Sequence, residues 1–344
     1  IQNISTDYGG AIFMIYSSPE LSNIEIKDNI AKAGGGIMLS SGAPRFTNLI
    51  VDSNIAEGLE GEIAGNGGGI FMTYSDPILD NVVLSNNICD DWGGGIGIWQ
   101  ECSPILNNVV ISGNISGQQG GGLWVMNSNL ILNNSLINDN YSSSYGGGLC
   151  LADNSVGNFI NVSIVNNYAE IFGGGFILDQ ANVILKNSIM WGNIPNSYGY
   201  AQPESVPNIE YSNIETSSEE LNPGIGNIRE IPLFVDSSNG DYSLQQNSPC
   251  IDSGIADLDG DGDEDITEYL GNAPDMGAYE FSYASYGDIN NDFILNIQDI
   301  IIYMNYILAN LELTTDQLLI GDLNDDGLLN IIDMLLLVKN ILSD

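Results

Sequence analysis

Hydrophobic and polar positions along residues 1–195 follow a pattern that repeats about every 26 residues. The unit is clearest at Gly93–Asn114, where a glycine triplet opens it, a short alternating stretch follows, and a second alternating stretch closes on Asn114. Stretches this short, with a period of two and bounded by Gly and Asn, are typical of strands. A repeat period between about 20 and 50 residues indicates a solenoid of stacked units.

Aligning the units places apolar residues in columns with one member per unit. Such columns predict parallel strands stacked in register, about 4.8 Å apart. We therefore expect a mainly β fold, a parallel β-helix of about seven coils over residues 1–200. The three apolar columns are Leu21, Phe46, Leu79, Leu106, Leu132, Phe159 and Leu185; Ile26, Val51, Leu84, Ile111, Ile137, Ile164 and Met190; and Ile30, Ile55, Ile88, Ile115, Tyr141, Tyr168 and Ile194.

Asparagine fills two further columns without a break. Stacked side-chain amides can bond to the coil above and the coil below, so both columns predict asparagine ladders. One column closes each unit and the other lies six positions earlier: Asn3, Asn29, Asn54, Asn87, Asn114, Asn140, Asn167 and Asn193, and Asn23, Asn48, Asn81, Asn108, Asn134, Asn161 and Asn187. Cys89 falls in a column of small residues that includes Ala56 and Ser116, where we expect a small core residue.

The repeat unit resembles those of polymorphic outer-membrane proteins and of the wider pectate-lyase-like β-helix group. The matching features are the two asparagine columns and the GGG or GGA triplets that begin at residues 9, 34, 67, 93, 120, 146 and 173. The resemblance implies a right-handed parallel β-helix and a secreted or cell-surface protein, here bacterial. It does not fix an activity, because the group includes lyases, hydrolases, adhesins and inert scaffolds.

Alternation along the glycine-led strand predicts an outward-facing stripe that is unusually apolar. A solvated sheet face would not carry such a stripe. Three interpretations remain open: a loop or the C-terminal region covers it, it contacts another protein copy, or it is an aromatic platform for sugar rings. The candidate contact residues are Phe13, Met38, Phe71, Trp99, Trp124, Met126 and Ile177.

The repeat stops near residue 200, and residues 201–283 contain phrases similar to the C-terminal cap of many secreted β-helix proteins, such as Ile231–Asp236 and Asp275–Glu280. We expect a β-rich closure of the solenoid. Within it, Asp257–Glu268 matches the calcium-loop pattern D-x-D-x-D-G-x5-E. Oxygen ligands for one calcium ion are then expected from Asp257, Asp259, Asp261, the Asp263 carbonyl and Glu268, with Gly262 at the sharp turn. The alternative is a solvated acidic loop.

Two related segments, 34 residues apart, form the end of the chain at residues 284–344. Each is an acidic loop followed by an apolar helix, expected to reach about Leu308 and Leu342. The duplication resembles a dockerin, a calcium-folded all-α module that docks onto cohesin domains. The resemblance implies calcium ligands at Asp288, Asn290, Asp292, Asn296 and Asp299, and at Asp322, Asn324, Asp326, Asn330 and Asp333.

The chain departs from the dockerin pattern in two ways. Phe293 stands where a glycine is usual, which predicts a distorted or weaker first site. Positions that carry polar recognition residues in many dockerins are mostly apolar here: Ile297, Gln298, Ile331 and Ile332. The expected interface is therefore apolar, and its partner is a cohesin-like domain, the protein's own solenoid or another copy of the chain.

Charge narrows the function classes. Six basic residues stand against 45 acidic ones, a formal net charge of −39, so nucleic acid and anionic membranes are excluded as partners. No apolar run is long enough to span a bilayer. Histidine is absent and no cysteines form a CxxC pair, which argues against zinc. The solenoid shows no stacked acidic column and few basic residues, so catalysis is not expected.

These features favour a secreted, non-catalytic β-helix with a structural or adhesive role, assembled through its calcium-bound C-terminal module. The first coil already matches the repeat, so we expect upstream chain or another molecule to cover it. With the apolar stripe and apolar helices, this suggests a head-to-tail homopolymer, an extracellular filament. The alternative is a β-helix that binds or degrades polysaccharide.

Overall fold

The structure is a computed structural model that describes residues 3–58, 65–200, 205, 207–216, 224–281, 287–290, 295–324 and 326–343. The chain divides into two compact units, residues 1–280 and residues 281–344. The region expected as a cap therefore forms one unit with the solenoid as far as Glu280. In the part that the structure describes, no helix is both long and apolar enough to cross a membrane.

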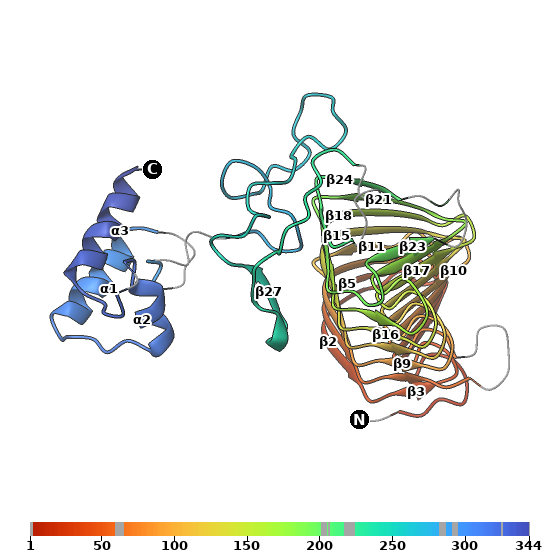
Figure 1. Ribbon diagram of the computed structural model, residues 1–344. Helices are drawn as coiled ribbons and strands as arrows, with labels where there is room; N and C mark the ends of the chain where they lie inside the picture. Colours follow the sequence, from red (N-terminus) through yellow and green to blue (C-terminus); the bar gives the residue numbers. More distant parts are fainter. Residues whose placement is uncertain are drawn as a thin grey trace. The chain divides into compact units, whose positions relative to one another are not determined.

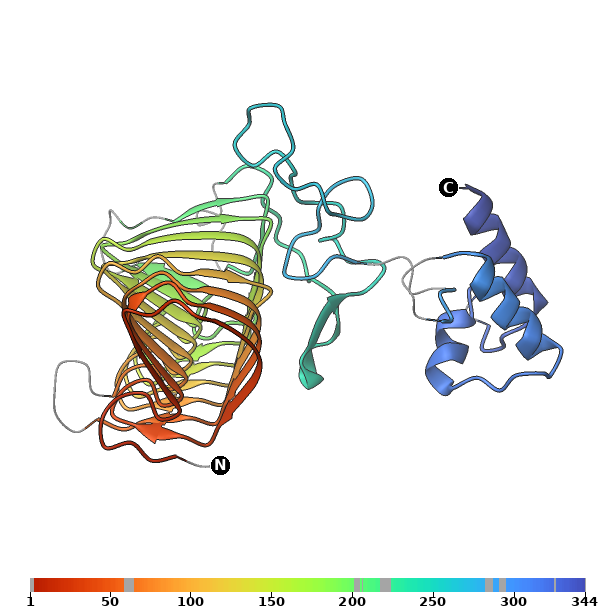
Figure 2. The same cartoon turned by 180° about the vertical axis from the view of Figure 1, so that it is seen from behind.

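The described coils of the first unit stack into a parallel β-helix with three sheets, as Figures 1 and 2 show. The glycine-led strands form one sheet, in the order β1 (Ile12–Ile15), β4 (Ile37–Gly42), β7 (Ile70–Ser75), β10 (Ile96–Trp99), β14 (Leu123–Met126), β17 (Leu149–Ala152), β20 (Phe176–Asp179) and β23 (Tyr198–Tyr200). The shortest strands form another: β3 (Ile30–Ala31), β6 (Ile55–Ala56), β9 (Ile88–Cys89), β13 (Ile115–Ser116), β16 (Tyr141–Ser142) and β19 (Tyr168–Ala169).

The third sheet contains the strands before each closing asparagine. Its members are β2 (Glu20–Lys27), β5 (Arg45–Asp52), β8 (Ile78–Ser85), β11 (Ile105–Asn107), β12 (Val110–Ser112), β15 (Asn129–Asn138), β18 (Val156–Val165), β21 (Asn182–Lys186), β22 (Ile189–Trp191), β24 (Asn208–Glu210) and β25 (Asn213–Ile214). Pairing is parallel and in the register that the repeat predicts, for example Phe46 with Leu79 and Leu106 with Leu132. The predicted β-helix is confirmed.

Two of the three apolar columns line the core. From Phe46 to Leu185 the first column is fully buried, and so is the second from Val51 to Met190. The third column also stacks in register, but it does not line the core. Its side chains face outward, with Ile115 and Tyr168 about 40% exposed, because β-strand alternation sends the neighbouring small residues inward. Those small residues, Cys89 among them, are buried as expected.

The closing asparagines form a continuous buried ladder. Asn114 is typical: its Oδ1 accepts from the backbone N–H and the Nδ2 of Asn87, both at 2.9–3.0 Å. Its own Nδ2 donates to Asn140 Oδ1 and to the Leu84 carbonyl, both at 3.0 Å. Both ends of each amide are therefore satisfied inside the core, which makes the predicted ladder a structural requirement.

The second asparagine column has a different basis. Every member has a positive φ, between 48° and 56°, a left-handed conformation that asparagine tolerates better than most residues. Side-chain bonds join only some of the described pairs, such as Asn161 to Asn134 at 3.0 Å. The prediction of a continuous second ladder is wrong, because the shared requirement is a backbone bend rather than a buried amide.

The glycine triplets allow the coils to approach closely. The first glycine has a positive φ, for example 74° at Gly93. A Cβ on the second, Gly94, would lie 2.3 Å from the Gly121 carbonyl oxygen of the next coil. Only glycine fits this contact, and for that reason the triplet recurs in each unit.

The stripe expected to face outward is covered by the chain itself. Met38, Phe71, Trp124 and Ile177 are at most 6% exposed. They pack with residues that directly precede glycine triplets, namely Tyr8, Ala33, Trp92 and Tyr145. The Trp92 and Trp124 rings stack with centroids 4.9 Å apart. A contact surface at these four residues is therefore ruled out, and covering by a loop is confirmed. Phe13 stays 47% exposed, and Trp99 and Met126 are half-buried.

The cap is less regular than expected. Between residues 224 and 280 its described strands are the hairpin β26 (Phe234–Asp236) and β27 (Asp241–Leu244), joined by the 3-10 turn η2 (Ser237–Asn239). Buried Tyr242 of this hairpin donates its hydroxyl to Asp139 at 3.1 Å and accepts from Asn166 at 2.9 Å. Ala278 donates its N–H to Ser163 Oγ at 3.0 Å. These hydrogen bonds join the cap to the side of the solenoid.

The second unit contains the helices α1 (Ile297–Ile307), α2 (Thr315–Gly321) and α3 (Ile331–Ser343). Its core centres on Ile289, Tyr303 and Leu337, which are fully buried. The core is internally symmetric, because Tyr303 and Leu337 occupy equivalent positions of the two 34-residue segments, as do Ile289 and Leu323, and Leu295 and Leu329. The duplication visible in the sequence thus packs as two similar halves.

Candidate metal centres

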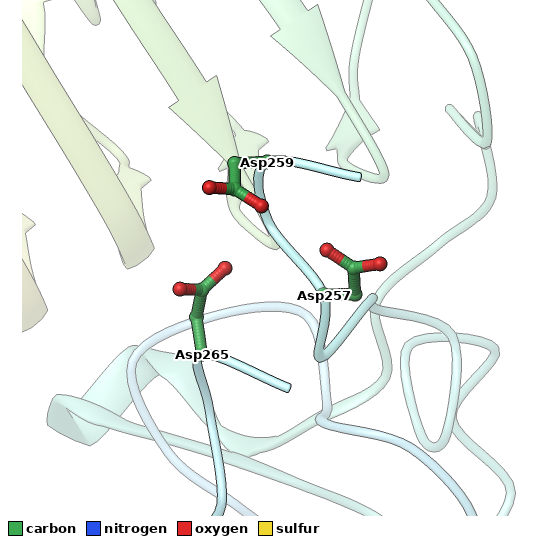
Figure 3. Close-up of side chains that lie close together, drawn as sticks. All are labelled: Asp257, Asp259 and Asp265. Carbon is green, nitrogen blue, oxygen red and sulfur yellow. The ribbon is translucent and has the colours of Figure 1, made fainter. Parts of the chain in front are cut away.

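Three carboxylates of the cap loop converge on one point (Figure 3). Each of Asp257, Asp259 and Asp265 offers an oxygen, and these oxygens lie within 4.8 Å of one another. In the part of the chain that the structure describes, no other group of three acidic, Cys or His side chains meets this criterion. Oxygen-only ligands suit a hard cation such as calcium.

The loop backbone holds Asp257 in place. Its carboxylate accepts from the N–H of Gly260 at 2.7 Å and of Gly262 at 3.0 Å. Both glycines have a positive φ, 78° and 100°, so Gly262 makes the turn expected of it. The base of the loop is anchored to the solenoid, where Asn187 exchanges two hydrogen bonds of 2.9 Å with the backbone of Ile255.

The three carboxylates differ in part from the ligands expected from the sequence. Asp261 accepts from the Asp263 N–H at 2.9 Å and lies outside the cluster, and Glu268 lines a separate polar cleft with Asn108 and Asn161 of the solenoid. Asp265 takes part instead, and its carboxylate also accepts from the Leu258 N–H at 2.7 Å. The missed signal is position nine of the loop, which is a ligand position, often through water, in loops of this kind.

The first loop of the second unit buries two of its expected ligands. Asp288 is 2% exposed and Asp299 is fully buried. The Asp299 carboxylate accepts from the N–H of Asn290 at 3.4 Å and of Asn296 at 2.9 Å, and Asn296 caps α1 by accepting from the Gln298 N–H at 2.7 Å. The expected ligand Asp292 and the unusual Phe293 lie outside the described residues.

The second loop repeats this arrangement. Fully buried Asp333 accepts from the N–H of Asn324 at 3.2 Å and of Asn330 at 2.8 Å, just as Asp299 does in the first loop. Asp322 accepts from the N–H of Gly327 at 2.6 Å and of Asp326 at 3.1 Å. The expected oxygen ligands of this loop thus face the loop's own backbone.

One buried side chain, Tyr303, lies near the acidic residues of both loops. Tyr303 donates its hydroxyl to the Gly321 carbonyl at 2.9 Å. Burial raises its pKa first, and the negative charges of Asp333, Asp299 and Asp322 raise it further. Carboxylates of both loops therefore lie around this side chain. The only basic residue of the unit, Lys339, is exposed and forms no ion pair among the described residues.

The helices expose apolar side chains at equivalent positions. Ile297 is 67% exposed, and Ile331 and Ile332 are 56% and 51% exposed. One stripe along α1 continues through Ile301, Met304 and Leu308, and one along α3 through Leu335 and Leu342. Gln298 is exposed beside them. All three expected apolar contact residues of this unit therefore lie at its surface.

Two basic side chains of the solenoid, Arg45 and Lys186, form ion pairs with acidic side chains. Arg45 forms an ion pair with Asp80 at 2.5 Å, and Asn107 donates to the same carboxylate at 2.8 Å. Lys186 pairs with Glu210 at 2.8 Å and donates to the Leu258 carbonyl of the cap loop. All four cysteines are buried and free, so they form no disulfides.

Comparisons with known proteins bear on the solenoid. The family model described as right handed beta helix region matches residues 10–190, more than half of the chain. No match was found among curated proteins or among solved structures. With the parallel coils of Figure 1, the match shows that this chain belongs to the right-handed β-helix family.

Proposed function

We propose that this protein is a calcium-dependent structural or adhesive β-helix, exported from the cell, whose dockerin-like C-terminal unit attaches it to a protein partner. The observation that carries the proposal is the pair Asp299 and Asp333. Both carboxylates are fully buried at equivalent positions of the duplicated unit. Buried charges in proteins are paired or coordinate metals, and Lys339, the one basic residue in the sequence of this unit, has an exposed side chain.

Calcium would supply a positive charge beside these buried carboxylates. Asp299 and Asp333 stand at position 12 of their loops, where a carboxylate ligand completes the oxygen shell. Each lies in the first turn of its helix, so a cation there would join the loop to α1 or α3. A calcium-rich environment outside the cell suits this requirement, since extracellular calcium modules work at roughly 0.1–1 mM calcium.

The exposed apolar stripes of α1 and α3 supply the docking face. Exposed apolar patches on a soluble protein mark interaction sites. The high negative charge of the rest of the chain would keep the protein soluble although this patch is exposed. The stripes are equivalent under the internal repeat, with Ile297 matching Ile331 and Ile301 matching Leu335. The partner is a cohesin-like domain or another copy, and docking between copies would build a head-to-tail filament.

Hydrogen exchange of the full-length chain, with calcium and with chelator, tests the calcium step. We expect calcium to slow amide exchange in α1 and α3, and Asp333→Asn to remove the effect in α3 while lowering calcium affinity about tenfold for the loss of a charged ligand. Glu312→Gln removes an exposed carboxylate of the same unit and serves as the control. Identical exchange in both solutions would contradict the proposal.

Sedimentation velocity and electron microscopy test the docking step. With calcium we expect assemblies that chelator disperses and that the double substitution Ile331→Asp and Leu335→Asp prevents. Both side chains are more than half exposed, so the substitutions should leave the fold intact. Single particles in both solutions would remove self-assembly and direct the search to a cohesin-like partner.

A further inference from the structure

A hollow of about 510 Å³ opens on the side of the solenoid, over β17, β20 and β23. Its origin lies in two columns that pack face to face along the coils. Nearer the N-terminus, Trp92 of the covering turn stacks on Trp124 of the sheet, and the two large rings fill the space between turn and sheet. In the three coils that follow Trp124, its position in the sheet is taken by the smaller residues Cys150, Ile177 and Gly199. The space is therefore left open.

Aromatic rings form the walls of this hollow. Tyr145 and Phe172 come from the covering turns, and Tyr200 comes from β23. Phe172 and Tyr200 are each 40% exposed. Gly199 allows Phe172 to lie directly against the strand, since a Cβ there would be 2.1 Å from its ring. The floor, Cys150 and Ile177, is apolar and almost fully buried.

The polar groups that line the hollow include Gln119, two tyrosine hydroxyls and Asp179, and Asp179 alone among the lining residues carries a charge. Gln119 Oε1 already accepts from the Cys150 thiol at 3.4 Å. Burial and the nearby Asp179 raise the pKa of that thiol to about 12, so it stays neutral. The Asp179 carboxylate accepts no hydrogen bond from a described residue, and none of the six basic residues of the chain lines the hollow.

We infer that this hollow binds a small alkylammonium ion, held over the rings of Tyr145, Phe172 and Tyr200 and paired with Asp179. Aromatic rings attract a cation through the negative charge of their faces, and quaternary ammonium groups are recognised in this way. The unpaired carboxylate supplies the counter-charge, and the net charge of −39 raises the local concentration of cations.

Saturation-transfer NMR on the full-length protein tests the inference with choline as the probe. Its neutral isostere 3,3-dimethyl-1-butanol has the same shape and lacks the charge. We expect choline to bind about tenfold more tightly than the isostere, the ratio expected from one cation–aromatic contact together with one ion pair. Equal binding of the two would overturn the inference, because the hollow would then select for shape alone.

Two variants locate the binding. Asp179→Asn should weaken choline binding about tenfold, whereas Asp153→Asn, which removes a charge from the adjacent coil outside the hollow, should change it less than twofold. Phe172→Leu keeps an apolar side chain but removes a ring, and it should also weaken binding. The thermal midpoint of each variant checks its fold. Choline binding that survives both Asp179→Asn and Phe172→Leu in folded protein would assign it to acidic loops elsewhere and overturn the inference.

Discussion

At the scale of single residues, the same amino acid serves two physical purposes in this solenoid. Asn114 is fully buried and needs all of its amide hydrogen bonds, whereas Asn108 is exposed and is needed for its φ of 53°. Both columns are unbroken in the sequence, so spacing alone does not distinguish them. Burial distinguishes them, because an unpaired amide costs free energy only where water cannot reach it.

This difference leads to a prediction for matched substitutions. Asn114→Ala leaves the Asn87 N–H and the Leu84 carbonyl without partners in the core. The expected loss in the free energy of unfolding is about 2–6 kcal/mol, at 1–3 kcal/mol for each of the two unsatisfied groups. Asn108→Gly keeps the left-handed backbone accessible and should cost less than about 1 kcal/mol. Urea unfolding in constant calcium measures both, and equal losses would contradict the ladder.

At the scale of elements, the turns before the glycine triplets change the surroundings of the neighbouring strands. Where the residue before the triplet is aromatic, as at Trp92 and Tyr145, it packs on the outer face of the glycine-led sheet. From β4 to β20 the outward position nearest the triplet is buried, so this part of the sheet is covered on both faces. The strand then reads as a continuous apolar run, which is typical of strands in parallel sheets covered on both faces. The alternation rule fails here because it assumes that one face meets water.

A large-to-small substitution tests the covering layer. Trp124→Ala would open a cavity beneath Trp92 and should lower the free energy of unfolding by about 3–5 kcal/mol. Phe13→Ala, at the half-exposed position of the same stripe, should cost less than about 1 kcal/mol. Chemical denaturation followed by tryptophan fluorescence gives both values. A small effect at Trp124 would mean that the stripe is exposed after all.

At the scale of the whole molecule, the composition sets how stability depends on pH. The chain has no histidine, so few groups titrate near neutral pH. Burial raises the pKa of the Cys102 and Cys250 thiols to about 11, of Cys150 to about 12 and of Cys89 further. A raised pKa means that the folded state keeps the proton when the unfolded chain has lost it. The resulting stabilisation is complete below pH 9 and is lost progressively above it.

We therefore expect the free energy of unfolding to fall as the pH rises from 9 to 10, by roughly 1 kcal/mol per buried thiol, because the unfolded thiols are already partly ionised at pH 9. Cys102→Ser should reduce this slope by about a quarter, because it removes one of the four thiols. Serine suits the site, since the same column holds Ser75 and Ser128, and Ser128 Oγ accepts from the Cys102 N–H at 3.2 Å. Denaturant midpoints in reductant across this pH range provide the measurement. An unchanged slope would exclude the thiols as its cause.

Much of the fold follows from the sequence alone, because a solenoid places equivalent residues in equivalent environments. The period, the glycine triplets, two core columns and the buried asparagine ladder could each be read from local spacing. The duplicated C-terminal segments could be read in the same way, as Tyr303 and Leu337 show by sharing one core. In a repeat fold, contacts between coils are set by the period itself.

Tertiary structure decided those features that depend on contacts with other segments of the chain. The outward stripe is buried because turn residues fold over it, and the third apolar column faces outward because its smaller neighbours point inward. Asp265 joins Asp257 and Asp259 in the cluster, whereas Glu268 lies in a separate cleft, and the loop pattern alone does not decide between these two carboxylates. The hollow beside Tyr145 exists because Cys150 is too small to fill the space that Trp124 fills in its own coil. Local pattern determines which face a side chain takes, and only packing determines what lies against that face.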